Sequence, residues 1–243
     1  MPSVSGKRYW LVGASDGLGA ALARTLVAAG AEVIVSARSL DKLEVLASEL
    51  GDAASAVAVD IADAGSVAEA AETVGDIDGL VFLAGVYWPT KATEWDAEAV
   101  NAMFDINLTG AARVLGEVVP KMVAKDEGHI VLTGSLSGFR GLPGTIGYGA
   151  SKAGIMYLAE GMFADLKDTG VRVQVANPGF IKTRLTDKND FSMPFIMEPA
   201  QAAQEMLDHM RSTKFKKSFP TLFSLLFRVS QFMPDWLYYR IFR

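Results

Sequence analysis

Short apolar, β-rich runs alternate with segments of helical pattern along most of the chain, and this alternation constrains the fold more than any other feature. Apolar strands that alternate with helices form a parallel sheet covered by helices on both faces. We therefore expect one doubly wound α/β domain over residues 1–243, with a mostly parallel sheet of six to seven strands. The expected strands are 9–13, 31–37, 55–60, 79–85, 129–134 and 171–179, and the main expected helices are 20–30, 39–50, 97–125 and 148–168.

Composition narrows the functional classes. The length of 243 residues suits one α/β domain with a large core, and the net charge of −5 gives no overall attraction to nucleic acid. There is no cysteine, and His129 and His209 lie far apart, so we expect no disulfide and no metal site. The start of the chain lacks a signal-peptide pattern and no apolar run is long enough to span a bilayer, so we expect a cytoplasmic protein.

A glycine-rich loop follows the first expected strand. Gly13, Gly17 and Gly19 enclose Ser15, Asp16 and Leu18, directly before a helical segment. Glycines allow a tight turn and close backbone approach, and a helix N-terminus presents free N–H groups to an anion. In a Rossmann-type sheet this turn binds the pyrophosphate of a dinucleotide.

Two strand ends bear on which dinucleotide binds. An acid at the end of the second strand would hold the ribose 2′-hydroxyl of NAD, but this chain has Arg38 there, which suits the 2′-phosphate of NADP. We therefore expect NADP, with NAD less favoured. Asp60 ends the third expected strand, where it either accepts a hydrogen bond from the adenine amino group or caps the following turn.

The stretch 134–152 carries the groups for proton transfer. Tyr148 and Lys152 are four residues apart, so they share one face of a helix. A nearby ammonium stabilises a phenolate, so we expect Lys152 to lower the pKa of Tyr148. Ser135 can hydrogen-bond the oxygen that Tyr148 serves, although Ser137 is an alternative for that role.

Taken together, residues 7–185 resemble the short-chain dehydrogenase/reductase family in the order and spacing of several motifs. The glycine loop resembles the cofactor fingerprint of the family, and Ser135 precedes Tyr148 by the usual thirteen residues. The cofactor-binding residues that the resemblance implies are Gly13, Ser15, Asp16, Gly17, Leu18, Gly19, Arg38, Asp60, Ile61, Ala84, Gly85, Tyr148, Lys152, Pro178, Gly179, Ile181 and Thr183.

The resemblance also implies an activity, the interconversion of a carbonyl and an alcohol with NAD(P)(H), in a homodimer or homotetramer. The implied catalytic residues are Asn107, Ser135, Tyr148 and Lys152. Tyr148 would be the general acid or base, Lys152 would bind the nicotinamide ribose, Ser135 would orient the carbonyl oxygen, and Asn107 would hold a water beside Lys152. The chain departs from the family pattern at Val12, Phe82 and Leu83, where we expect altered packing and an intact reaction.

The loops at the carboxyl ends of the strands predict an apolar substrate. They contribute Val86, Tyr87, Trp88, Phe139, Leu142, Phe180, Phe191, Phe195 and Met197. Among their charged residues, Arg140, Lys182 and Arg184 are candidates to meet an anionic group. His129 is expected to be structural or solvated, and His209 to lie on an exposed helix.

The segment 211–243 is the unusual part of the chain. It carries seven Lys or Arg and one acidic residue, so its net charge is +6 whereas the preceding residues carry −11. After a short expected strand at 217–220, aromatics, leucines and cations recur at roughly helical spacing. The favoured hypothesis is a cover over the substrate pocket or a subunit interface. The other is a cationic amphipathic segment on an anionic membrane, with Trp236, Tyr238 and Tyr239 at the interface.

Two alternatives to an enzyme follow from the same residues. One is a non-catalytic NADP-binding regulatory protein, which would be expected to have lost Ser135, Tyr148 or Lys152. The other is a membrane-surface module in which the segment 211–243 is primary.

Overall fold

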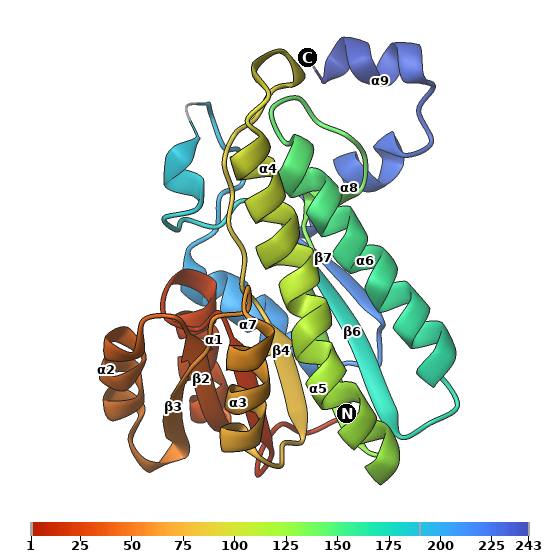
Figure 1. Cartoon of the computed structure of the whole chain (residues 1–243). Helices are drawn as coiled ribbons and strands as arrows, with labels where there is room; N and C mark the ends of the chain where they lie inside the picture. Colours follow the sequence, from red (N-terminus) through yellow and green to blue (C-terminus); the bar gives the residue numbers. More distant parts are fainter. Residues whose placement is uncertain (1, 190, 243) are drawn as a thin grey trace.

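The centre of the molecule is a seven-stranded sheet in which every pair of neighbouring strands is parallel (Figure 1). The computed structural model describes residues 2–189 and 191–242. The strand order is β3-β2-β1-β4-β5-β6-β7. The prediction of a doubly wound parallel sheet is confirmed. The strands are β1 (Arg8–Val12), β2 (Glu32–Ala37), β3 (Ala54–Ala58), β4 (Gly79–Phe82), β5 (Gly128–Thr133), β6 (Val171–Pro178) and β7 (Lys216–Phe219).

Helices cover both faces of the sheet, as the near-continuous apolar strands require. One core layer joins the sheet to α1 (Gly17–Ala28), α2 (Leu40–Leu50) and α7 (Pro199–Met210). The opposite layer joins it to α3 (Ala64–Val74), α5 (Gly110–Lys125) and α6 (Ile146–Leu166), and α4 (Ala97–Phe104) packs against α6. Short 3₁₀ turns at Gly51–Ala53, Ala92–Glu94, Leu136–Gly138 and Thr186–Lys188 complete the connections.

The order of strands reverses at β1, which pairs with β2 on one side and β4 on the other. The loops after β1 and β4 therefore diverge to opposite faces, which leaves a crevice at the carboxyl ends of these strands. The backbone closes tightly there: Gly13 N–H donates to Ser36 O at 2.7 Å, and Leu83 N–H donates to Val12 O at 2.8 Å. This edge is where a dinucleotide is expected to bind.

Several element boundaries differ from the expected ones, and three differences bear on the site. β3 ends at Ala58 rather than at Asp60, and β4 ends at Phe82 rather than at Gly85. The expected helix 97–125 is interrupted by a π-helical turn at Asp105–Thr109, which separates α4 from α5. π-helical turns are frequent at functional sites, and this one contains Asn107.

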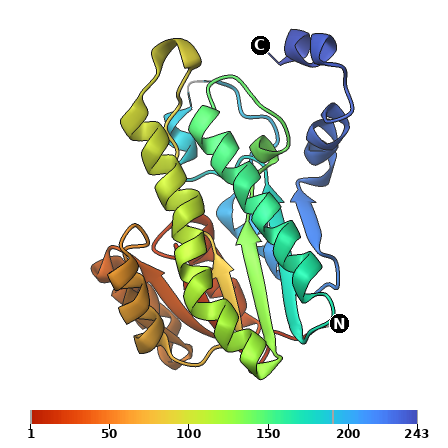
Figure 2. The same ribbon diagram turned by 45° about the vertical axis from the view of Figure 1, so that its right-hand side comes forward.

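The chain ends in two short helices, α8 (Thr221–Ser230) and α9 (Asp235–Ile241). They follow the edge strand β7 and lie beyond the carboxyl ends of the strands, on the same side of the molecule as the crevice (Figure 2). No helix in the described part of the chain has the length and apolarity to cross a bilayer.

Both histidines are buried, so the expectation that His209 lies on an exposed helix is wrong. His209 in α7 is 1% exposed, and His129 in β5 is 5% exposed. Arg172 lies 2.8 Å from His129 Nδ1 and can only donate, so the proton of the neutral ring sits on Nε2, which donates to Gln174 Oε1 at 2.8 Å. Burial, with a contribution from the Arg172 guanidinium, lowers the pKa of His129 to about 3.

The depressed pKa of His129 predicts a loss of stability in acid. Between pH 6.5 and about 3, the unfolded imidazole binds a proton and the folded one does not, so the free energy of unfolding falls as the pH falls. His129→Asn should lower stability at pH 7 but reduce the further loss between pH 7 and 5 by about 2 kcal/mol. Urea titrations at both pH values measure this difference.

The control is Asn101→His, which adds an imidazole at an exposed position of α4. It should leave the pH dependence of the parent unchanged. An identical pH dependence for the parent and His129→Asn would contradict the buried, neutral state of His129.

Candidate active site

The carboxyl end of β5 and the first turns of α6 bring the predicted proton-transfer groups together. Ser135 follows β5 directly, and Tyr148 and Lys152 lie on successive turns of α6. The connecting loop packs closely on α6, because a Cβ at Gly138 would lie 2.9 Å from Ala153 N. Ser135, Tyr148 and Lys152 thus lie together in one small site.

The Ser135 hydroxyl lies at the centre of this site. Its Oγ accepts hydrogen bonds from the Ser137 backbone N–H at 3.2 Å and from the Ser137 hydroxyl at 3.0 Å, and it also hydrogen-bonds the Tyr148 phenol. Ser137 thus donates to Ser135, and Ser135 is the serine that contacts the phenol. Because Oγ is an acceptor for both Ser137 groups, its own proton is free to reach Tyr148 or a substrate oxygen.

Tyr148 is partly buried, and its ring packs edge-on against Tyr87 with 5.1 Å between centroids. Burial raises the pKa of Tyr148 to about 12, although the hydrogen bond from Ser135 acts in the opposite direction. The expectation that Lys152 lowers this pKa is therefore not met in this structure. Lys152 Nζ lies 5.8 Å from the centroid of the Tyr148 ring and donates its hydrogen bond to the Thr133 carbonyl oxygen instead.

Lys152 is a cation in the interior of the protein. It is 3% exposed, and its Nζ donates to the Thr133 carbonyl oxygen at 2.9 Å. Burial lowers the pKa of Lys152 to about 8, so the ammonium form still predominates at neutral pH. Its remaining N–H groups are available to a bound hydroxyl or phenol oxygen.

Asn107 is fully buried in the π-helical turn and holds the loop after β4. Its Oδ1 accepts from Val86 N–H at 2.7 Å, and its Nδ2 donates to Val86 O and to Ser151 Oγ, both at 3.0 Å. Asn107 lies near Lys152, because a Cβ at Gly85 would be 3.4 Å from Asn107 Oδ1 and 3.5 Å from Lys152 Nζ. In this structure the Asn107 amide thus positions Val86 and α6, whereas the resemblance had implied that it holds a water.

The glycine loop fits a dinucleotide pyrophosphate. Gly13 has φ +95°, and a Cβ there would lie 2.4 Å from Ala84 N, so the turn requires glycine. A Cβ at Gly19 would lie 2.2 Å from Gly13 O. Asp16 caps α1 by accepting from Gly17 N–H at 2.7 Å, and the N–H groups of Leu18 and Gly19 have no partner among the described residues. These free donors at a helix N-terminus are what an anionic group requires.

The remaining cofactor-side residues line the same crevice. Thr183 faces the glycine loop, because a Cβ at Gly17 would lie 2.8 Å from Thr183 Cγ2. Arg38 follows β2 and is exposed. Asp60 accepts from Ala62 N–H at 3.0 Å, which matches the turn-capping alternative. The others lie at strand ends or just beyond them: Ser15 after β1, Ile61 after β3, Ala84 and Gly85 after β4, and Pro178, Gly179 and Ile181 at the end of β6.

The three cations that were candidates to meet an anionic group all have protein partners. Lys182 pairs with Glu198 at 3.0 Å, and Arg184 pairs with Asp16 of the glycine loop. Arg140 pairs with Asp235 at the start of α9.

Arg140 makes further contacts with the end of the chain. Its Nη1 donates to Ser230 O and Met233 O, both at 2.7 Å, and its guanidinium lies 4.0 Å from the centroid of the Tyr238 ring. The Tyr238 hydroxyl in turn donates to Gly141 O at 2.9 Å. The loop between Ser135 and Tyr148 is thereby fastened to α8 and α9.

An apolar wall stands beside the site and includes residues that the sequence did not single out. Leu136 packs with Phe223 and Phe227 of α8, and Phe139, Leu142 and Phe180 join this cluster. Phe223 also stacks on Phe195 with 5.5 Å between centroids. The missed residues Phe223 and Phe227 are four apart on the inner face of α8, a spacing that was visible in the sequence. Of the expected lining, Val86 and Trp88 pack with Tyr87 and Tyr148, and Met197 packs against the core.

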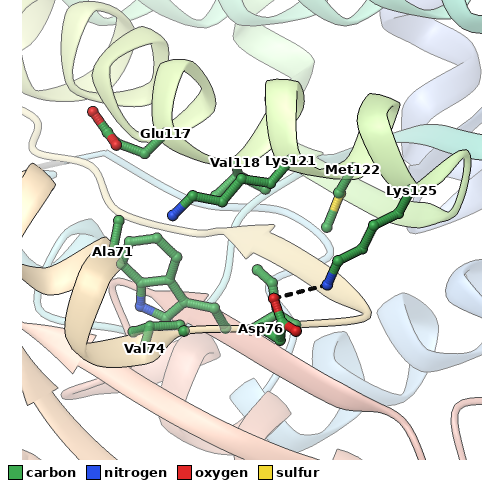
Figure 3. A pocket seen from close by; sticks show the side chains of 11 residues that line it. Ala71, Val74, Asp76, Glu117, Val118, Lys121, Met122 and Lys125 are labelled. Atoms are coloured by element: carbon green, nitrogen blue, oxygen red, sulfur yellow. Dashed lines mark ion pairs between the residues drawn. The ribbon is translucent and has the colours of Figure 1, made fainter.

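A separate hollow lies between the ends of α3 and α5, at the amino ends of the strands (Figure 3). Its lining includes Trp10 and Val74. Lys125 and Asp76, also in the lining, form an ion pair at 2.8 Å. It lies at the opposite end of the strands from Tyr148, and its lining contains no Ser, Thr, Cys or His. The described residues contain no cluster of His, Cys, Asp or Glu that could hold a metal ion.

Comparisons with known proteins agree with this fold. An oxidoreductase from Myxococcus xanthus is 36% identical over 98% of this chain and 97% of its own length. A short chain dehydrogenase from Burkholderia cenocepacia, solved in complex with NADP, has a TM-score of 0.89 at 24% identity and covers 100% of both chains. A short chain dehydrogenase/reductase from Burkholderia phymatum, solved in complex with NAD, has a TM-score of 0.87 at 21% identity and covers 95% of this chain and 94% of its own.

The family model described as short chain dehydrogenase matches residues 7–192, which contain the glycine loop, Ser135, Tyr148 and Lys152. The predicted resemblance is confirmed: the chain belongs to the short-chain dehydrogenase/reductase family of oxidoreductases.

Proposed function

We propose that this protein interconverts a carbonyl and an alcohol with NADP(H), and that Tyr148 is its general acid or base. The observation that carries the proposal is the meeting of a phenol, the Ser135 hydroxyl and the buried Lys152 ammonium beside the crevice that fits a dinucleotide. A non-catalytic nucleotide-binding protein would have no use for a buried cation at this position, since burying an ammonium is costly.

The chain's own residues would handle the proton and the substrate oxygen. A bound nicotinamide would supply or accept the hydride at the carbonyl carbon. Tyr148 is protonated near neutral pH and would donate to the oxygen as negative charge develops there. Ser135 would donate a second hydrogen bond to that oxygen. Lys152, whose Nζ lies 5.8 Å from the centroid of the Tyr148 ring, would hold the nicotinamide ribose beside it.

The preference for NADP rests on Arg38. Its guanidinium is exposed after β2, it has no partner among the described residues, and no acid follows this strand to bind a ribose hydroxyl. A guanidinium forms strong, bidentate hydrogen bonds with a phosphate. The structural neighbours have been solved with both NADP and NAD, so the preference depends on this chain's own residue.

An apolar carbonyl or alcohol is the substrate class that the surroundings favour. The cluster of Leu136, Phe180, Phe223 and Phe227 forms one wall, and Arg140, Lys182 and Arg184 are neutralised by acidic partners. With these cations engaged, the site has little to offer an anionic substrate. The α8 helix thus acts as a cover over the pocket.

We expect the protein to form a homodimer or homotetramer in the cytoplasm. The outer surface of α4, α5 and α6 suits the contact between its subunits. Tyr157 of α6 is 79% exposed, and Phe163, Val123 and Phe104 are also exposed on this side. Exposed apolar side chains on neighbouring helices are typical of a subunit contact.

Tyr148→Phe tests the mechanism directly. Removing the proton donor should lower turnover by about 100-fold or more. Affinity for NADPH should change less than about twofold, because the phenol contributes little charge to the cofactor site. Turnover is followed at the nicotinamide absorbance with a panel of carbonyls and alcohols, and cofactor affinity by calorimetry. Asp165→Asn, at an exposed position of the same helix, is the control, and full turnover in Tyr148→Phe would refute the proposal.

Arg38→Ala tests the cofactor preference. Loss of a charge-assisted contact should weaken NADPH binding by about 10- to 100-fold and leave NADH binding nearly unchanged. Dissociation constants for both cofactors measure the effect, and Lys121→Ala, at an exposed position of α5, is the control. An equal loss for NADPH and NADH would show that Arg38 has no role at the 2′-phosphate.

Arg140→Gln tests whether α8 and α9 cover the pocket. The change removes the ion pair with Asp235 and weakens the contacts that hold the two helices, so KM for an apolar substrate should rise about tenfold while NADPH affinity stays constant. Limited proteolysis after residue 220 should also become faster. Arg228→Gln, an exposed position on α8, is the control, and an unchanged KM in Arg140→Gln would show that the cover is not part of the substrate site.

A further inference from the structure

The α8 helix is apolar on two opposite faces. Phe223, Ser224, Phe227 and Ser230 face the protein and are buried. Leu222, Leu225, Leu226 and Val229 face outward and are 68%, 44%, 45% and 58% exposed. A helix that is apolar all round is normally buried on every side. We therefore expect another surface to cover the outward residues of α8.

The exposed apolar surface continues beyond α8. Phe232 is 88% exposed in the turn, and Trp236, Tyr239 and Ile241 of α9 are 70%, 53% and 54% exposed. We call this set the outer tail face: Leu222, Leu225, Leu226, Val229, Phe232, Trp236, Tyr239 and Ile241. Both helices lie at one extremity of the molecule, beyond the sheet (Figures 1 and 2). Exposed apolar clusters of this kind mark interaction sites.

The charges around the outer tail face indicate which kind of partner it binds. Arg228 and Arg240 are exposed, and the single acid of these two helices, Asp235, already pairs with Arg140. In a two-fold contact between two copies, the same face would meet itself, and the cations of both copies would gather without an acidic partner. An anionic lipid surface would supply the missing counter-charge.

We propose that the outer tail face docks on an anionic bilayer surface, with the aliphatic side chains of α8 in the interface and Trp236 and Tyr239 at the level of the headgroups. Aliphatic residues flanked by cations and by Trp or Tyr are the composition of helices that lie in such an interface. The contacts of Arg140 with Ser230, Met233 and Asp235 hold the two helices in place, so the face is a preformed platform.

Docking would place the substrate site next to the bilayer. Phe223 and Phe227 on the inner side of α8 belong to the apolar wall beside Ser135, while the outer side would contact lipid. The docking step itself depends only on the outer tail face and holds whether or not the proposed reaction is correct.

Co-sedimentation of the full-length protein with vesicles tests the proposal. Vesicles of phosphatidylcholine with about one-third phosphatidylglycerol should sediment the protein at low salt, pure phosphatidylcholine vesicles should bind it much more weakly, and added salt should release it. The double change Phe232→Ser and Trp236→Ser should weaken binding about tenfold or more, because two exposed aromatics lose their burial in lipid. Arg228→Gln with Arg240→Gln should weaken binding only to the anionic vesicles, by about tenfold.

Val45→Ser, at a 71% exposed apolar position on α2, is the matched control and should bind as the parent does. Circular dichroism confirms that each variant is folded. No sedimentation with anionic vesicles at low salt would overturn the proposal, as would equal binding to both vesicle types. A fall in oligomeric state by light scattering in Phe232→Ser with Trp236→Ser, with vesicle binding unchanged, would show instead that the face joins two copies of the chain.

Discussion

The burial of the Lys152 ammonium is the constraint on which the rest of the site depends. A buried cation is tolerated only with hydrogen-bond acceptors, and the Thr133 carbonyl at the end of β5 provides one. This bond fixes the start of α6 against β5, so Tyr148, one turn earlier on the same helix face, is held beside the Ser135 hydroxyl. The close contact of Gly138 with α6 and the Asn107–Ser151 hydrogen bond serve the same end from two other segments.

The layout of the sheet, and the placing of Tyr148 and Lys152 on one helix face, could be predicted from local sequence. Parallel strands are apolar throughout, so their alternation with helices was visible, and the four-residue spacing of Tyr148 and Lys152 fixed their common face. The ends of elements could not be predicted in the same way. Apolarity continues from β4 into Leu83 and Ala84, although the pairing with β5 stops at Phe82. The π-helical turn at Asp105–Thr109 has no local pattern, because its Asn107 is held by Val86 from another part of the chain.

The ion-pair partners and the pKa values could not be predicted from the sequence, because they depend on contacts between residues that are far apart along the chain. Arg140 and Asp235 are 95 residues apart in the sequence, and nothing near Arg140 indicated that its guanidinium was already occupied. The same holds for Tyr148, whose pKa follows burial by its surroundings more than its neighbour on the helix. The inner residues Phe223 and Phe227 were visible as a helical pair, but only the fold shows that they face Leu136.

The end of the chain unites the two hypotheses that its sequence left open. A cover over the pocket requires an apolar inner face, and a membrane contact requires an apolar outer face with cations. The α8 helix has both, because its buried residues lie at 223, 224, 227 and 230 while exposed aliphatic residues lie at 222, 225, 226 and 229. Arg140 supports the combination, since it pairs with Asp235, and Arg228 and Arg240 remain as the exposed charges of α8 and α9. The residue that joins the loop before Tyr148 to α8 and α9 thereby also neutralises the acid of α9.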